Sequence, residues 1–349
     1  MKIVQILTTT SGGGMEQVTI DYSRVLLSQK HEVFTITKPN SWISKNLPQG
    51  VVKCYQKHFR PWYFLDVWRL RKLLREIKPD VVIAHNRAFF IMRKVRLKDC
   101  PVILFLHNHK FKDNYNEAEA IITITNNIKT HLIKKLIPGN KVYVIQNMTT
   151  LLPSLKLERN NDKRILVIGG CGRLEPEKGF DVYIKSLKIL KDKGQIFKAV
   201  LAGSGTCERK LHHLAHELGL DGTLQFLGWI GNKEDFYNSL DIFCLPSLYE
   251  SFGIALLEAF VNKLPVVSTD SEGPSEIIKH NYDGILVEKN NPEALAEGII
   301  KVLEDKELRS KLAINGYNAV KSHYSQEVVG KKISEVLSQV IKNFKESSV

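Results

Sequence analysis

The chain has 349 residues, 43% of them hydrophobic and 25% charged, with a formal net charge of +13. This length exceeds one ordinary hydrophobic core and predicts two domains. The five cysteines are scattered without a CxxC pair, which argues against a disulfide framework and a zinc site and is typical of a cytoplasmic protein. No apolar stretch reaches the roughly 18 residues of a membrane-spanning helix, and the first apolar run is too short for a signal peptide.

The excess of positive over negative charge is confined to the first part of the chain. The first 150 residues contain 24 Lys and Arg against 10 Asp and Glu, and the remainder contains 26 against 27. We therefore expect this part to meet an anionic partner. A basic nucleic-acid-binding protein is the alternative from another functional class. Because RRM, KH and helix-turn-helix patterns are absent from the sequence, we expect no nucleic acid partner.

Short runs rich in β-branched residues alternate with amphipathic stretches of helical length along the whole chain. Runs of this kind are typical of buried parallel strands. In the first half they span residues 2–7, 32–37, 80–85, 101–106, 121–125 and 142–145; in the second half they span 164–170, 198–203, 224–228, 241–246, 265–269 and 284–287. Two rounds of alternation predict an α/β protein with two doubly wound, Rossmann-like parallel-sheet domains.

The two domains are expected to meet at residues 149–163, where the pattern gives way to polar residues and a proline. The predicted N-terminal domain spans residues 1–148, and the predicted second domain spans residues 164–325. Such sheets bind ligands beyond the carboxyl ends of their strands, so the cleft between the domains is the expected site.

Residues 60–78 predict a helix with two different faces. One face is apolar and should pack on the sheet; it contains Tyr63, Val67, Leu70, Leu73, Leu74 and Ile77. The other face contains Phe64, Trp68, Arg71, Lys72 and Arg75. Aromatic and basic side chains together suit anionic lipid headgroups, with help from residues 92–98. The alternative is that Phe64 and Trp68 pack under a neighbouring loop.

Three glycine-rich turns follow predicted strands at residues 11–17, 169–179 and 202–208. Each lacks the last glycine of GxGxxG, which argues against a nicotinamide dinucleotide, and there is no GxxxxGK[ST] motif. The turns still place backbone N–H groups at helix starts, where phosphates bind. Arg173 and Lys178 flank the Pro-containing part of the second turn and suit a diphosphate, although solvated surface charges are an equal alternative.

Glu250 and Glu258 bracket the start of a predicted helix after the strand at 241–245. The free N–H groups near residues 252–255 would bind a phosphate, and the two carboxylates would accept hydrogen bonds from sugar hydroxyls. Glu258 lies in an otherwise apolar run, so it needs a partner. The alternative is that this partner is a structural arginine or a backbone amide.

The order of these motifs resembles a known family. Glu250-x7-Glu258, preceded by "GRLEPEKG", "VLAGSG" and "FLGWI" and followed by "EGPSEIIKHNYDGILV", resembles the retaining glycosyltransferases of family 4 (group 1). The opening "GGGMEQVTIDYSRVLLSQKHEV" resembles the start of the same family, so the similarity covers nearly the whole chain. The resemblance implies a GT-B fold with two domains facing a central cleft. It also implies that a C-terminal helix from about residue 326 to 349 joins the N-terminal domain.

The resemblance also implies roles for residues. Glu258 would hold the donor ribose, Glu250 would contact the transferred sugar, and Arg173 with Lys178 would neutralise the diphosphate. His107, with His109 as a near alternative, would lie beside the reacting sugar. The implied catalytic group is His107, Arg173, Lys178 and Glu250; the implied donor-binding group is Gly13, Gly14, Arg173, Lys178, Gly203, Gly205, Ile230, Glu250, Phe252, Gly253, Ile254 and Glu258. Asn147 departs from the family because Met148 and Thr149 follow it.

The implied activity is a hexosyl or N-acetylhexosaminyl transfer from a nucleotide-diphosphate sugar to a glycan or lipid-linked acceptor. We expect it to serve cell-surface polysaccharide or lipopolysaccharide assembly at the inner face of the cytoplasmic membrane. Because the sequence has no Asp-x-Asp, we expect neither a metal nor another cofactor. Within the same fold, a nucleotide-sugar epimerase is the alternative; a phosphorylase would need a lysine-bound cofactor, for which no motif is present.

Overall fold

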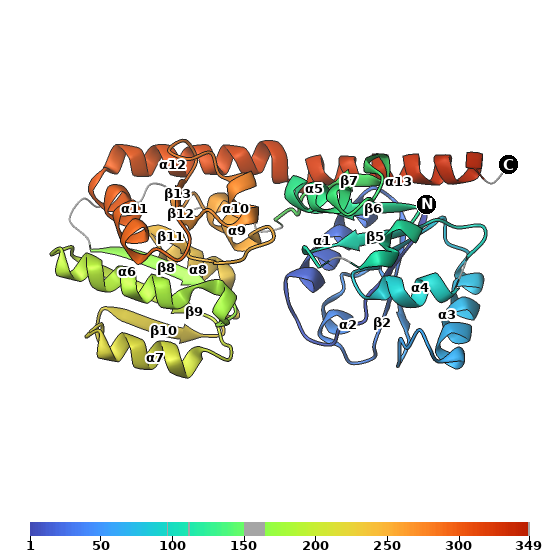
Figure 1. Cartoon of the computed structure of the whole chain (residues 1–349), viewed down its shortest axis with the longest axis horizontal. Helices are drawn as coiled ribbons and strands as arrows, with labels where there is room; N and C mark the ends of the chain where they lie inside the picture. The colour runs from blue at the N-terminus through green and yellow to red at the C-terminus, as the bar shows by residue number, and fades with distance from the viewer. Residues whose placement is uncertain (96, 111, 150–164, 348–349) are drawn as a thin grey trace. The chain divides into compact units, whose positions relative to one another are not determined.

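The computed structural model describes residues 1–95, 97–110, 112–149 and 165–347. Its contacts divide the chain into two compact units, Met1–Met148 with Gln326–Val349, and Thr149–Ser325 (Figure 1). Apart from Thr149, the expected linker at 149–163 lies outside the described residues. Each unit is built on its own parallel sheet, so the expected fold class of two doubly wound α/β domains is confirmed.

The sheet of the first unit has seven parallel strands in the order β3-β2-β1-β4-β5-β6-β7. The strands are β1 Lys2–Ile6, β2 Glu32–Thr37, β3 Val52–Tyr55, β4 Val81–His85, β5 Val102–Leu106, β6 Ala120–Thr123 and β7 Val142–Val144. All six runs predicted in this half form strands. The prediction missed β3, because this edge strand is largely exposed and lacks a buried apolar run.

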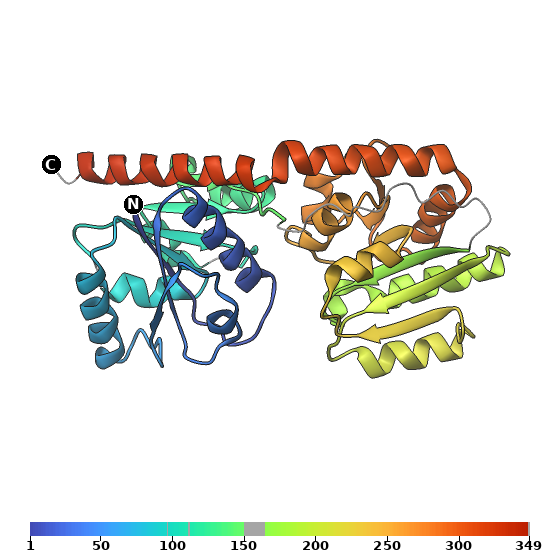
Figure 2. The same ribbon diagram turned by 180° about the vertical axis from the view of Figure 1, so that it is seen from behind.

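The helices of the first unit are α1 Gly14–Ser28, α2 Trp42–Asn46, α3 Phe64–Ile77, α4 Ala88–Val95, α5 Asn126–Lys134 and α13 Gln326–Ser347, with 3-10 turns η1 Asp113–Glu117 and η2 Gly139–Lys141. The last helix, α13, packs on α1 (Figure 2). Gly330 makes this contact close, because a Cβ atom there would lie 2.3 Å from Val25 Cγ1. Ser334 hydrogen-bonds to Gln29, and Lys332 Nζ donates to Gln146 Oε1 at 2.9 Å.

Helix α3 follows the expected two-faced pattern with one exception. Leu70, Leu74 and Ile77 are buried, and Val67 and Leu73 are half-buried. The prediction was wrong for Tyr63, which precedes the helix as its N-cap residue and is exposed. Its place on the buried side is taken by Asp66, which accepts a hydrogen bond from Arg60 Nε at 2.8 Å.

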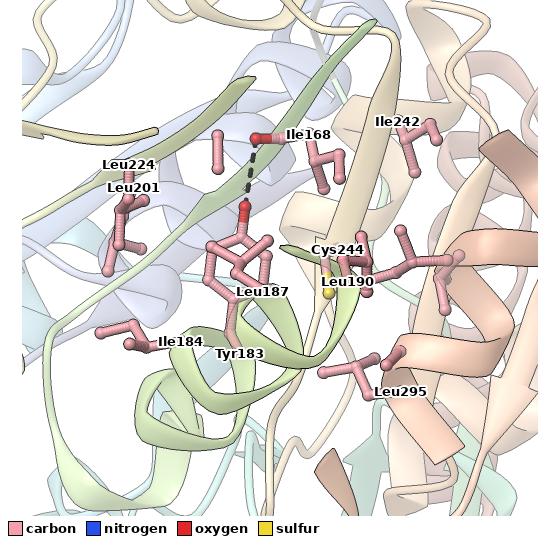
Figure 3. Packing of buried hydrophobic residues seen from close by; sticks show 14 of the residues in the cluster. Ile168, Tyr183, Ile184, Leu187, Leu190, Leu201, Leu224, Ile242, Cys244 and Leu295 are labelled. Atoms are coloured by element: carbon pink, nitrogen blue, oxygen red, sulfur yellow. Dashed lines mark hydrogen bonds between the residues drawn. The ribbon is translucent and has the colours of Figure 1, made fainter. Parts of the chain in front are cut away.

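The sheet of the second unit has six parallel strands in the order β10-β9-β8-β11-β12-β13. The strands are β8 Leu166–Cys171, β9 Phe197–Ala202, β10 Leu224–Gly228, β11 Ile242–Leu245, β12 Val266–Thr269 and β13 Ile285–Val287. They coincide with the six runs predicted in this half. Figure 3 shows part of the core, where the Tyr183 hydroxyl donates to the Ile168 carbonyl at 3.1 Å and Leu187, Leu190 and Cys244 pack nearby.

The helices of the second unit are α6 Phe180–Asp192, α7 Glu208–Glu217, α8 Lys233–Ser239, α9 Ile254–Val261, α10 Glu272–Ile277, α11 Pro292–Glu304 and α12 Lys306–Ala319, with a 3-10 turn η3 Pro176–Lys178 and a π-helical turn η4 Val320–Tyr324. Helix α12 packs on α9, where a Cβ atom at Gly316 would lie 2.4 Å from the Phe260 ring. Among the described residues of both units, no helix combines the length and apolarity needed to cross a bilayer.

Candidate active site

Two of the glycine-rich turns interlock at the carboxyl ends of β8 and β9. Gly203 has φ +138°, and a Cβ atom there would lie 1.8 Å from the Gly172 carbonyl oxygen. A Cβ atom at Gly205 would lie 2.5 Å from the carbonyl oxygen of Leu174, whose amide donates to the Ser204 carbonyl at 2.9 Å. Gly203 and Gly205, which were expected to bind the donor, are therefore also needed for the fold, because only glycine lets the two turns approach so closely.

The expected cations, Arg173 and Lys178, lie within the turn that follows β8. Arg173 is mostly exposed and pairs with Glu177, its Nη2 lying 3.1 Å from Glu177 Oε1. Lys178 ends η3 and is followed by Gly179, which has φ +62°. Gly179 packs against the loop after β11 so closely that a Cβ atom there would lie 2.1 Å from the Pro246 carbonyl oxygen. The Glu177 carbonyl also accepts the amide of Leu248 at 2.9 Å. This close contact holds the cation-bearing turn against the loop that follows β11.

Glu250 lies on that loop and meets Lys178. The Lys178 Nζ lies 2.6 Å from Glu250 Oε2, and both side chains are largely buried, with 19% and 16% exposure. A charge-assisted bond of this kind is stronger than one between neutral groups. The structure therefore joins one expected diphosphate-binding cation to the carboxylate expected to contact the sugar.

Helix α9 begins at Ile254, close to the expected start. Its N-cap residue is Gly253, which has φ +102° and so needs glycine. Phe252 is buried, and the backbone of Gly273 packs against it so closely that a Cβ atom at Gly273 would lie 2.4 Å from Phe252 Cα. Just before α9, the Phe252 amide donates to Glu250 Oε1 at 3.5 Å, and the Glu250 carbonyl accepts the Gly273 amide at 2.8 Å.

Glu258 is buried and finds both partners on helix α8. The Lys233 Nζ lies 2.5 Å from Glu258 Oε1, and the Tyr237 hydroxyl donates to Glu258 Oε2 at 2.8 Å. The expected alternative partners, an arginine or a backbone amide, are not the ones found. Burial is the main reason why the pKa of Tyr237 lies well above its usual value, so the hydroxyl keeps the proton that it donates.

Cys171, at the end of β8, adjoins this group. Its Sγ lies 3.4 Å from the Tyr237 hydroxyl. Burial raises the pKa of the Cys171 thiol to about 12; the Tyr237 hydrogen bond and the charges of Lys233 and Lys178 oppose this rise, and the charge of Glu258 adds to it. The sequence reasoning missed Lys233 and Tyr237. A signal was available, since Lys233 lies three residues after the end of the "FLGWI" motif at Ile230 and Tyr237 lies one helical turn beyond Lys233.

The first unit, taken by itself, has the N-terminal glycine loop between β1 and α1. A Cβ atom at Gly12 would lie 2.8 Å from the Trp42 ring, whereas Gly13 has an extended backbone and precedes Gly14, the first residue of α1. Glu16 is buried and accepts a hydrogen bond from the Thr9 hydroxyl. The loop is therefore held at both ends by side chains of its own unit.

The two expected histidines lie in different surroundings. His107 follows β5 and is partly buried, with its Nε2 2.8 Å from His85 Nδ1. Burial lowers the pKa of His107 to about 3, and burial with the neighbouring His107 lowers the pKa of His85 well below its usual value. His109 instead lies 2.7 Å from Asn127 Oδ1 through its Nε2. Asn147 is buried, and its side-chain oxygen has no hydrogen-bond partner among the described residues.

Comparison with known families agrees with this arrangement. The family model described as "Glycosyl transferases group 1" matches residues 153–319, and the model described as "Glycosyltransferase Family 4" matches residues 12–151. The two matches follow one another along the chain and cover both units. The chain is a group 1 glycosyltransferase.

Relatives of this glycosyltransferase match it over nearly their whole lengths. LpsD of Rhizobium meliloti, a lipopolysaccharide core biosynthesis glycosyltransferase, is 27% identical over 94% of this chain and 96% of its own. An alpha-1,4-N-acetyl-D-galactosaminyltransferase of Campylobacter jejuni is named for a glycan on diphospho-undecaprenol. It is 26% identical over 96% of this chain and 99% of its own. The crystal structure of Anabaena HepE with UDP and glucose superposes on this structure with TM-score 0.83. The superposition covers 97% of this chain and 99% of HepE, at 20% sequence identity. The glycosyltransferase has the GT-B fold.

The aromatic and basic face of α3 is exposed in this glycosyltransferase. Phe64 is 73% exposed and Trp68 is 48% exposed, so the expectation that they pack under a loop is wrong for this structure. Lys72 Nζ lies 5.7 Å from the Trp68 ring. Arg71 lines the same surface hollow as Trp68, Lys72 and Arg75, and its guanidinium also donates to the carbonyls of Lys94 and Val95 at the end of α4.

Proposed function

We propose that the chain is a retaining glycosyltransferase that moves a sugar from a nucleotide-diphosphate sugar to a glycan or lipid-linked acceptor. The observation that carries the proposal is the pair of lysine–carboxylate contacts in the second unit. Lys178 holds Glu250, and Lys233 holds Glu258, each near the end of a strand or the start of a helix. Such an arrangement offers carboxylates to hydroxyl groups and cations to phosphates in one region.

The donor would bind by exchanging these internal contacts for contacts with its own groups. Glu258, paired with Lys233 and oriented by Tyr237, would accept hydrogen bonds from the ribose hydroxyls. Lys178 would pass from Glu250 to the diphosphate, which would free Glu250 to contact the transferred sugar. The N–H groups at the start of α9 would add to the binding of the diphosphate.

The protein would promote the transfer by stabilising the charges that develop in the transition state, without a cofactor. Breaking the bond between sugar and diphosphate places negative charge on the leaving phosphate and positive charge on the sugar. Lys178, Arg173 and the start of α9 are fixed positive groups that would stabilise the first of these charges. We propose that transfer needs no metal and that the sugar keeps its anomeric configuration.

The acceptor is proposed from the relatives and from the first unit. Relatives are named for lipopolysaccharide core assembly and for a glycan on diphospho-undecaprenol, an acceptor anchored in a membrane. We propose the same class of acceptor, at the inner face of the cytoplasmic membrane. The protein would reach it from the cytoplasm through the exposed face of α3.

This face has the composition of a surface that meets anionic lipid. Phe64, Trp68 and the preceding Trp62, which is 82% exposed, would enter the headgroup layer. Lys72 and Arg75 would meet lipid phosphates, each contributing about 1 kcal/mol near such a surface. The excess of positive charge in the first 150 residues acts in the same direction.

Vesicle co-sedimentation tests the membrane surface. Lys72→Glu/Arg75→Glu should release the protein from anionic vesicles and leave binding to neutral vesicles weak. Arg209→Glu/Lys210→Glu on α7 makes the same change in charge at another exposed site and is the matched control. Equal binding to neutral and anionic vesicles, or equal loss in both variants, would contradict the proposal.

A panel of nucleotide sugars tests the transfer itself. Each donor is incubated with and without undecaprenol-diphosphate-linked glycans, and the released nucleotide and the anomeric configuration of the product are measured. We expect acceptor-dependent release that survives EDTA and is lost in Glu258→Ala. A sugar epimer formed without acceptor would favour the epimerase. Salt-dependent oligonucleotide binding that is unaffected by Glu258→Ala would favour a nucleic-acid-binding protein.

A further inference from the structure

A row of polar side chains lies between helix α1 and the sheet of the first unit. Gln5 of β1 pairs in register with Ile83 of β4, two residues before His85, so Gln5 and His85 are on the same face of the sheet. His85 pairs in turn with Phe105 of β5, two residues before His107. Gln5 and His85 are fully buried, and the row ends at the partly exposed His107.

The hydrogen bonds in this row have one direction, which begins at a backbone carbonyl of α1. The Ser23 hydroxyl lies 2.8 Å from the Thr19 carbonyl oxygen, which can only accept, so Ser23 donates. Gln5 Nε2 lies 2.7 Å from Ser23 Oγ and therefore donates to it. The other end of the same amide, Gln5 Oε1, is left as an acceptor 3.2 Å from His85 Nε2.

The same donor-to-acceptor order continues through the hydrogen bonds of His85 and His107. His85 Nε2 must carry the proton that it donates to Gln5. Since a neutral imidazole has one N–H, His85 Nδ1 is an acceptor, and it lies 2.8 Å from His107 Nε2. His107 Nε2 therefore donates, and its other nitrogen, Nδ1, keeps a free lone pair. Burial lowers the pKa of both histidines, which keeps both rings neutral near pH 7.

We infer that Ser23, Gln5 and His85 are positioning residues that hold His107 in the Nε2–H tautomer, so that Nδ1 accepts a hydrogen bond from a substrate hydroxyl. The identity of that hydroxyl, on the donor sugar or on the acceptor, rests on the proposed function. The backbone of His107 is held as well, because its amide donates to Asn86 Oδ1 at 3.0 Å. Both the position and the proton of the ring are thus set before any substrate arrives.

Nitrogen-15 NMR of histidine-labelled, ligand-free protein tests the tautomer directly. The signals of His107 are assigned by their loss in His107→Asn. We expect a protonated Nε2 and an unprotonated Nδ1 in the wild-type protein. In Gln5→Met, a change that keeps the size of the side chain, His85 loses its acceptor and should reverse both bonds, moving the His107 proton to Nδ1. Gln5→Glu restores an acceptor and should restore the wild-type pattern.

Gln56→Met is the matched control, because it removes another buried glutamine of the same unit, one that donates to the carbonyls of His58 and Asp66. It should leave the His107 signals unchanged. A protonated Nδ1 in the wild-type protein would overturn the inference. So would an unchanged tautomer in a Gln5→Met protein whose circular dichroism shows that it is folded.

Transfer kinetics supply a second measurement. Gln5→Met should lower kcat about tenfold, the equivalent of one lost hydrogen bond, and Gln5→Glu should recover most of it. The expected NMR pattern without any sugar transfer would reject the proposed function and leave the tautomer assignment intact. Unchanged kcat in Gln5→Met, with the tautomer reversed, would overturn the contact between Nδ1 and a substrate hydroxyl.

Discussion

Lys233 and Glu258 form an ion pair between helices α8 and α9, with Lys233 Nζ 2.5 Å from Glu258 Oε1. Glu258 is buried within an apolar helix, whereas the lysine side chain is 44% exposed. Tyr237, one turn after Lys233, donates to the second carboxylate oxygen at 2.8 Å. Helix α8 thus supplies partners for both oxygens, as a buried carboxylate requires.

The first prediction concerns the Tyr237 hydroxyl. Tyr237→Phe should lower the free energy of unfolding of the second unit by about 1.5–3 kcal/mol, because it removes a buried hydrogen bond to a charged group. Tyr183→Phe is the matched control, since that buried hydroxyl donates to the neutral Ile168 carbonyl. It should cost only about 0.5–1.5 kcal/mol. Urea denaturation measures both, and an equal or larger loss in Tyr183→Phe would contradict the prediction.

The second prediction concerns Lys178. Lys178→Met should lower kcat by about 10²–10³, because the leaving diphosphate loses a fixed cation and Glu250 loses its partner. Lys185→Met, an exposed lysine of α6 that pairs with Asp181, is the control and should leave kcat unchanged. Steady-state kinetics with the accepted donor measures the effect. A change confined to KM would mean that Lys178 binds the ground state and the transition state equally and would contradict the prediction.

The sheets could be predicted from the sequence because their strands are buried on both faces. Runs such as residues 101–106 are apolar throughout, and Val102–Leu106 indeed forms a fully buried strand. The edge strand β3 gave no such signal, since three of its four residues are exposed. The close contact at Gly330 was equally invisible, because it depends on a partner residue about 300 positions away.

The site could be predicted only where a motif carries its own spacing. Glu250 and Glu258 were found this way, as were Arg173 and Lys178. Lys233, Tyr237 and His85 were missed, because each acts through a residue that is distant in sequence and near only in the fold. Sequence periodicity also treated Arg71 as a free surface cation, whereas tertiary contact with the end of α4 engages its guanidinium.

The third prediction concerns the packing of α13 on α1. Gly→Ala within a helix usually stabilises by about 1 kcal/mol. Gly330→Ala should instead destabilise the first unit, because the new Cβ would lie 2.3 Å from Val25 Cγ1. Val25→Ala in the same protein should recover part of the loss by removing that methyl group. Thermal unfolding of the two single variants and the double variant measures the coupling, and strictly additive effects would contradict it.

The fourth prediction is a pH dependence that comes from His85 and His107. Burial lowers the pKa of His107 to about 3 and that of His85 well below its usual value, whereas an unfolded histidine has a pKa of about 6.5. Below about pH 6.5 the unfolded chain therefore binds more protons than the folded one, so stability falls as the pH falls. Each of these histidines should lower the free energy of unfolding by up to about 1.4 kcal/mol for each unit of falling pH. For His107 this decrease should continue toward about pH 3.

Urea unfolding at about pH 7.5 and about pH 5 measures this slope. His107→Asn should flatten it, because one of the protons by which the folded and unfolded states differ is removed. A residual slope is expected from His85 and from His31, whose pKa is also lowered by burial. His213→Asn, at an exposed position of α7, is the control and should leave the slope as it is. If His107→Asn and His213→Asn give the same slope as the wild-type protein, His107 is not held neutral by burial in the folded state.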